Sequence, residues 1–120
     1  MLEPGMREAA ELAGDRWVLL LVAALADGPR RFGDLAADVE GIAPNVLTDR
    51  LRRMESRGLV TASPYQQRPR RYVYELTEPG RELAALLPGL AAWGATTGGL
   101  TPPGERPADA PDDGEPLLWV

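Results

Sequence analysis

Arginine is the residue type whose placement says most about the chemistry available to this 120-residue sequence. All thirteen basic residues are arginine, and nine of them lie between residues 30 and 72 beside five acidic residues. This stretch therefore has a local charge of +4, although the whole chain has a net charge of −5. Clustered guanidinium groups favour contact with phosphate, so the middle of the chain is the first candidate for a surface that binds a polyanion.

Few residues could carry out catalysis or hold a metal. The sequence contains no cysteine and no histidine, which removes thiol and imidazole nucleophiles, bases and metal ligands. Asp34, Asp38 and Glu40 could suggest a site for a hard cation, but their spacing favours the solvated face of a helix. We therefore expect no enzymatic activity, no metal and no cofactor.

A set of polar side chains lies on a predicted helix over residues 43–57. Pro44 suits its first turn, and Leu47, Leu51 and Met54 form an inward apolar stripe. The helical period then places on the outward face Asn45, Thr48, Asp49 and Arg52, with Arg50, Arg53 and Arg57 beside it. These residue types can bind base edges and phosphates, and the flanking arginines could instead form internal salt bridges. A solvated helix surface is the alternative interpretation.

A second basic group lies at residues 64–71, which we predict to be the tip of a β-hairpin between strands at residues 59–63 and 71–77. The tip carries Gln67, Arg68, Arg70 and Arg71 on a loop that Pro69 keeps extended. An extended arginine-rich loop fits a narrow, strongly negative minor groove. A soluble turn without a partner is the alternative.

The surrounding elements explain how these groups would be positioned. We expect helices over residues 6–13, from Asp15 to about residue 26, and over residues 32–39. A turn that contains a glycine joins the helix at 32–39 to the helix at 43–57. A final helix follows Thr77 as its N-cap. The predicted fold class is α+β and mainly helical, a winged helix-turn-helix with a two-stranded wing and terminal dimerisation helices. It occupies residues 1–100, and residues 101–120 form a proline-rich acidic tail.

Two of these helices are more apolar than one small domain can cover. The second helix has apolar residues on more than one side, and the last helix has a long leucine stripe. We expect these helices to meet in a homodimer, or to line a cavity for a small-molecule effector, through Trp17, Leu21, Leu86, Leu90 and Trp93. For the tryptophans, packing in the protomer's own core is the alternative.

Segments over residues 8–94 together resemble the HxlR family of bacterial winged-helix regulators, within the MarR-like superfamily. The resemblance is carried by DGPRRF-x-DL at residues 27–35, which includes Arg31, and by Y-x-LT-x-x-G at residues 74–80. It implies a homodimer, formed through the first and last helices, that binds a roughly palindromic operator. Many family members carry a sensing cysteine before the second helix, and its absence here excludes thiol-based sensing by this sequence.

The predicted function is a sequence-specific, DNA-binding transcriptional regulator with double-stranded DNA as its partner. A winged-helix module that binds proteins without specific DNA binding is the alternative, supported by the acidic overall charge. The longest apolar stretch, residues 17–26, is shorter than the roughly 20 residues of a membrane span, and the N-terminus lacks a signal pattern. We therefore expect a cytoplasmic protein without membrane contact.

Overall fold

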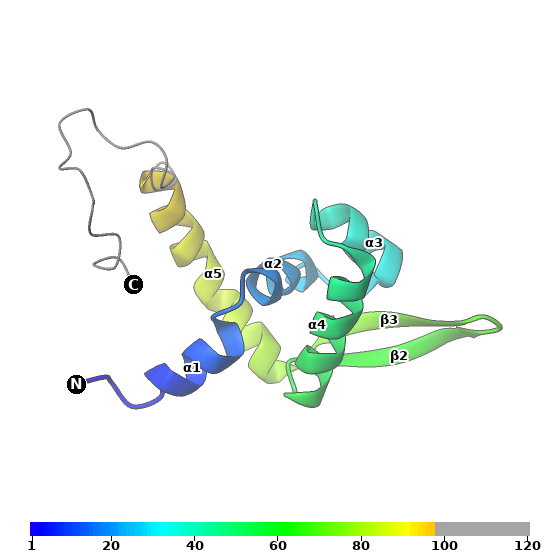
Figure 1. The fold of residues 1–120 in the computed structure, drawn as a ribbon, viewed down its shortest axis with the longest axis horizontal. Coiled ribbons are helices and arrows are strands. Elements are labelled where there is room, and N and C mark those ends of the chain that lie inside the picture. Colours follow the sequence, from blue (N-terminus) through cyan, green and yellow to red (C-terminus); the bar gives the residue numbers. More distant parts are fainter. Residues whose placement is uncertain (98–120) are drawn as a thin grey trace, which may run out of the picture. The chain divides into compact units, whose positions relative to one another are not determined.

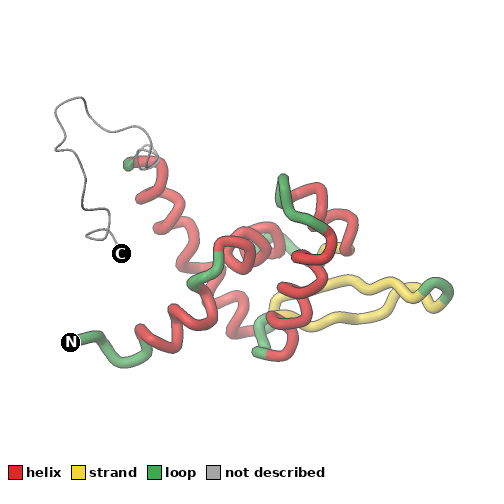
Figure 2. The backbone as a smooth tube through the Cα atoms, viewed as in Figure 1, coloured by secondary structure: helices red, strands yellow, loops and turns green. Residues whose placement is uncertain are grey.

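The computed structural model describes residues 1–97, so the predicted tail at 101–120 lies outside the described residues. Residues Met1–Leu90 form one compact unit. The elements are α1 (Met6–Ala13), α2 (Arg16–Leu25), β1 (Arg30–Arg31), α3 (Phe32–Asp38), α4 (Pro44–Ser56), β2 (Val60–Gln67), β3 (Arg70–Leu76) and α5 (Glu78–Thr96), as Figures 1 and 2 show. The predicted fold class is confirmed.

Helix starts follow local capping chemistry. The Asp15 carboxylate accepts hydrogen bonds from the backbone N–H groups of Trp17 and Val18, as expected of an N-cap. The Thr77 hydroxyl accepts from the Gly80 N–H at 3.2 Å and so caps α5. Pro44 occupies the first turn of α4, where its missing N–H costs nothing. Three of the helix starts predicted from the sequence are therefore confirmed.

The core lies where α2, α3 and α4 meet the inner end of the sheet. Its buried side chains include Val18, Leu21 and Val22 of α2, Leu35 of α3, Leu47, Leu51 and Met54 of α4, and Leu76 of β3. The predicted inward stripe of α4 is thus correct. Leu21, in contrast, is 0% exposed and belongs to this core, so its predicted place in a dimer or ligand surface is wrong.

The sheet differs from the prediction in two respects. Strand β1 was not predicted, and it pairs with β3 so that the strand order is β1-β3-β2, all antiparallel. Strands β2 and β3 also run much closer to the tip, with only Arg68 and Pro69 between them. Pro64 does not end β2 because β2 is an edge strand, and a register shift between Pro64 and Gln66 absorbs the irregularity. The wing is therefore a long hairpin that projects beyond the helices (Figure 1).

Over residues 1–97, no helix combines the length and the apolar character that crossing a bilayer requires.

Candidate nucleic-acid interface

The outward face of α4 presents most of the polar residues expected there. Asn45, Asp49 and Arg52 are exposed, and Thr48 is half-buried. They lie opposite the buried stripe of the same helix because the helical period separates the two faces. Figure 1 shows α4 at the base of the β2–β3 hairpin, so the helix and the wing belong to one continuous region.

Three charged residues of α4 already have partners within the chain. The Arg50 Nε donates to the Asp15 carboxylate at 2.9 Å, and another nitrogen of Arg50 donates to Asp49 at 2.7 Å. The same oxygen of Asp49 accepts from Arg53 at 3.0 Å. The internal salt bridges considered as an alternative for Arg50 and Arg53 are therefore present. Arg52 also belongs to α4, and within residues 1–97 no ion pair is seen for it.

The pairing changes the ionisation of both groups. Burial raises the pKa of the Asp15 carboxyl, but hydrogen bonds from the Val18 N–H, the Arg50 side chain and the Trp17 N–H outweigh it and lower the pKa overall. The hydrogen bond to Asp15 raises the pKa of Arg50. Both shifts favour the charged forms, so the pair is an ion pair at neutral pH.

Two tyrosines lie along one face of β3. The rings of Tyr72 and Tyr74 lie 6.5 Å apart with a 47° tilt, and Arg70 makes a long hydrogen bond of 3.5 Å to the Tyr72 hydroxyl. Burial raises the pKa of Tyr74, as does the negative charge of Glu55, while the positive charge of Arg52 lowers it. Glu55 and Arg52 belong to α4, so charges of that helix act on the Tyr74 hydroxyl.

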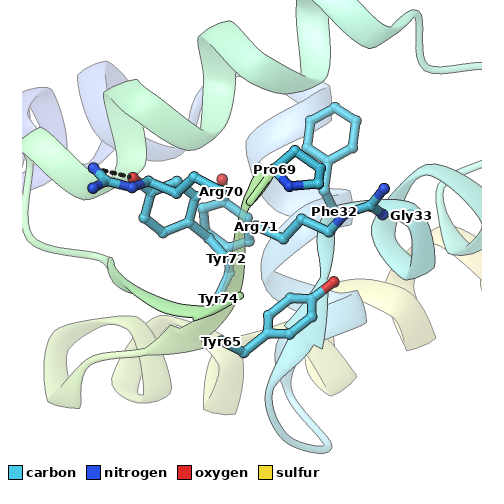
Figure 3. A pocket seen from close by; sticks show the side chains of 8 residues that line it. All are labelled: Phe32, Gly33, Tyr65, Pro69, Arg70, Arg71, Tyr72 and Tyr74. Carbon is cyan, nitrogen blue, oxygen red and sulfur yellow. Dashed lines mark hydrogen bonds between the residues drawn. The ribbon is translucent and has the colours of Figure 1, made fainter. Parts of the chain in front are cut away.

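The wing also borders an open groove. A cavity of about 460 Å³ lies between Phe32 and Gly33 at the start of α3 and the aromatic and arginine side chains of the wing (Figure 3). In this view Arg70 turns towards Tyr72, while Arg71 extends in the opposite direction, towards α3. Successive strand residues point to opposite faces of a sheet, so the two arginines serve different sides of the wing.

A second aromatic contact involves Arg31. Its guanidinium lies 4.6 Å from the centroid of the Tyr65 ring, and Arg31 pairs with Val73 in the β1–β3 register. Residues from β1 and β2 thus meet across β3. Cation–π stacking holds the guanidinium plane against the ring without neutralising its charge.

The residues predicted for a dimer or ligand surface divide into two groups. Leu86, Leu90 and Trp93 are 68%, 45% and 58% exposed. Trp17 is half-buried and packs against the core, and the guanidinium of Arg16 lies 4.4 Å from its ring. Core packing, the alternative interpretation for Trp17, therefore applies to part of its surface. The groove described above lies at the wing and not beside Trp17.

Two of the three acidic residues considered for a cation site, Asp34 and Asp38, have structural partners. Asp34 accepts a hydrogen bond from the Arg31 backbone N–H at 3.1 Å, which closes the first turn of α3. Asp38 forms an ion pair with Arg30 at 3.7 Å. No cluster of three potential metal-ligating residues occurs in the part of the chain that the structure describes.

Two features of the site were missed from the sequence. The alternation of Tyr72 and Tyr74 in β3 is a period-two signal that could have indicated an aromatic face. The contact between Asp15 and Arg50 gives no such signal, because 35 positions separate the two residues.

Comparison with known proteins finds relatives that are named as transcriptional regulators. It is 44% identical over 86 residues to an uncharacterized HTH-type transcriptional regulator of Mycobacterium tuberculosis H37Rv, covering 72% of this chain and 54% of that protein. It is 33% identical over 90 residues to the HTH-type transcriptional regulator YodB of Bacillus subtilis, covering 75% of this chain and 80% of YodB. The chain thus spans about half the length of its mycobacterial relative.

Solved structures have the same fold. The reduced form of YodB aligns with a TM-score of 0.67 at 32% identity, covering 80% of this chain and 94% of YodB. A structure from Porphyromonas gingivalis W83, classed with the MarR family of transcriptional regulators, aligns with a TM-score of 0.72 at 25% identity, covering 79% and 93%. Residues 12–100 of this chain match the HxlR-like helix-turn-helix family. This chain belongs to the HxlR-like helix-turn-helix family.

Proposed function

We propose that the chain is a sequence-specific regulator of transcription that binds double-stranded DNA as a homodimer. The observation that carries the proposal is the outward face of α4, where Asn45, Thr48 and Arg52 stand beside an arginine-bearing wing. Membership of the family supports it, because the matched relatives are named as HTH-type transcriptional regulators.

In this proposal α4 enters the major groove. An asparagine can pair with adenine, an arginine with guanine, and a threonine can contact phosphate or a thymine methyl group. Asn45 and Arg52 are therefore the proposed base readers, and Thr48 supports them. Pro44, Asp49 and Arg53 border this face as secondary contacts. Arg50 is withdrawn from the predicted set because its guanidinium is already bound to two carboxylates.

The wing contributes contacts that position the protein. Arg68, Arg70, Arg71 and Gln67 lie near its tip, and Arg31 lies at its base above the Tyr65 ring. Guanidinium groups on an extended hairpin suit the minor groove or the adjacent phosphates. Such contacts add affinity for any sequence, whereas α4 supplies the preference.

A homodimer would place two copies of α4 about 34 Å apart, or a multiple of that, along a pseudo-palindromic operator. The exposed side chains of Leu86 and Leu90 support an interface on α5. A small-molecule effector and a cytoplasmic location are part of the same proposal. Regulation by these 120 residues would not use a thiol, because they contain no cysteine.

The test is selection of bound duplexes from a random double-stranded pool by the purified protein, followed by sequencing. We expect an enriched pseudo-palindrome whose affinity falls steeply with salt. Asn45→Ala and Arg52→Ala should each weaken binding to it by about 1–3 kcal/mol and relax the preference at particular base pairs. Arg7→Ala, which removes the same charge from α1, is the control for Arg52. Absence of any enriched sequence, together with salt-insensitive capture of a protein, would instead support the protein-binding alternative.

A further inference from the structure

One carboxylate connects α2 to α4. One oxygen of Asp15 accepts the Trp17 N–H at 2.8 Å and the Val18 N–H at 3.2 Å, which caps α2. The other oxygen accepts Arg50 Nε at 2.9 Å. The capping interaction therefore uses only half of the carboxylate, and the other half holds the neighbouring helix.

The ion pair between Asp15 and Arg50 is better shielded from solvent than the ion pair between Asp49 and Arg53. The side chains of Arg50 and Asp15 are 21% and 26% exposed, whereas those of Asp49 and Arg53 are 54% and 55% exposed. Water and salt screen exposed ion pairs strongly, so the Asp15–Arg50 pair is the firmer contact of the series.

Arg50 occupies a position on α4 from which it can control rotation of the helix. The helical period places it on the flank between the buried stripe of Leu47 and Leu51 and the outward face of α4. Apolar packing of that stripe fixes the distance between α4 and the core, but such packing is not directional. A charge-assisted hydrogen bond from the flank is directional, and it constrains how α4 is turned about its axis.

We propose that Asp15 is a positioning residue for the recognition helix: through Arg50 it sets the rotation of α4 at which Asn45 and Arg52 meet the bases. The inference rests on the proposed DNA-binding function and deepens it. Arg50 serves here as a structural partner, and its charge is not available to phosphate.

Positioning by Asp15 and simple electrostatic repulsion predict opposite effects on operator binding when the Asp15 charge is removed. An acidic side chain near a DNA-binding surface repels phosphate, so removing its charge would strengthen binding to every duplex. Positioning predicts that the same change weakens binding to the operator while affinity for random duplex stays the same or rises. The ratio of the two dissociation constants therefore separates the two effects.

The experiment measures dissociation constants for the selected operator and for a random duplex at several salt concentrations. Asp15→Ser keeps an N-cap oxygen for α2 but cannot form an ion pair with Arg50. We expect it to reduce the ratio of specific to non-specific affinity about tenfold. Asp27→Asn is the matched control, since it removes one acid for which residues 1–97 show no ion pair. The control should keep the wild-type ratio.

Arg50→Gln is a second variant that leaves the cap of α2 intact. It should reduce the same ratio with an unchanged salt slope, whereas loss of a phosphate contact would lower that slope by about 0.9 and weaken all duplexes alike. A lowered slope with an unchanged ratio would overturn the proposal, as would wild-type ratios in both variants. If the wild-type protein itself selects no sequence, the proposed function fails first and this inference fails with it.

Discussion

At the scale of single residues, the arginines of this protein differ in what they already contact. Arg50 and Arg53 pair with carboxylates on or beside α4, whereas Arg68 and Arg71 show no ion pair within residues 1–97. An arginine already paired must lose that partner before it neutralises phosphate, which reduces the gain. The sequence left both outcomes open for Arg50 and Arg53, because composition and helical period do not show side-chain pairing.

The wing arginines should therefore dominate the salt dependence of binding. Arg68→Ala and Arg71→Ala are each expected to weaken binding to all sequences and to lower the slope of log affinity against log salt by about 0.9 for each lost phosphate contact. Titrations at several salt concentrations measure this slope. Arg7→Ala on α1 is the matched control and should leave it unchanged. An unchanged slope in the wing variants would exclude these residues from the interface.

The Asp15 pair should also appear in the pH dependence of folding. The pKa of Asp15 is below its ordinary value of 3.8 in the folded protein, so on acidification the unfolded chain takes up this proton first. The stabilisation is complete above that ordinary value and is lost as the pH falls through the lowered folded pKa. The difference in unfolding free energy between the wild type and Asp15→Ser should therefore shrink in acid. Urea melts from pH 7 to pH 2.5 measure it, and a pH-independent difference would contradict the pairing.

At the scale of elements, predictions based on local chemistry succeed. The range predicted for the first helix, residues 6–13, agrees with α1, and the caps at Asp15 and Thr77 are where capping residues indicated. These starts depend on hydrogen bonds between residues two or three apart in sequence. A single sequence contains that information directly.

Predictions that depend on distant pairing fail. Strand β1 has two residues, and it exists because Arg30 pairs with Tyr74. Pro64 indicates a strand end when only its neighbours are considered, yet it is tolerated in β2 because that strand is at the edge of the sheet. Strand order decides both outcomes, and strand order is a property of the assembled fold.

The junction between α5 and the end of α4 should be sensitive to one added methyl group. A Cβ at Gly80 would overlap the Leu59 carbonyl oxygen and approach the Leu76 side chain to 3.0 Å. We expect Gly80→Ala to destabilise the fold by about 1–3 kcal/mol, because the tight contact involves backbone that cannot move freely. Gly33→Ala on α3, where no atom lies within 4 Å, should instead stabilise it by about 0.5–1 kcal/mol. Chemical denaturation measures both, and equal effects would contradict this account of Gly80.

At the scale of the whole molecule, the charge distribution is more informative than the total. The overall charge of −5 would disfavour contact with DNA, yet the positive segment lies in α4 and the wing. A field that is positive on one surface can steer a polyanion to that surface despite an acidic total. The basic segments that would form such a surface can be located in the sequence. The apolar residues cannot be sorted in the same way, and the structure was needed to show that Leu21 of α2 is buried while Leu86 and Leu90 of α5 are exposed.

The exposed leucines of α5 carry the prediction of a homodimer. Burying a leucine side chain fully contributes about 1.5–3 kcal/mol, and in a two-fold interface each residue is buried in both protomers. Leu86 and Leu90 are 68% and 45% exposed, so burying what remains of both in two protomers would contribute about 3–7 kcal/mol, against an association cost of about 4–15 kcal/mol. The leucines therefore offset part of the association cost, and further apolar surface such as Leu20 is needed to make a dimer stable.

Replacing both leucines by glutamate should therefore convert the dimer to a monomer. Light scattering at micromolar concentration should give twice the 13.0 kDa chain mass for the wild type and the single chain mass for the Leu86→Glu, Leu90→Glu variant. Ala85→Glu places a similar charge on another side of the same helix and should leave the mass doubled. On DNA the monomeric variant should protect one half-site where the wild type protects two. A wild-type protein that is monomeric throughout, or a double variant that remains dimeric, would show that α5 does not form the interface.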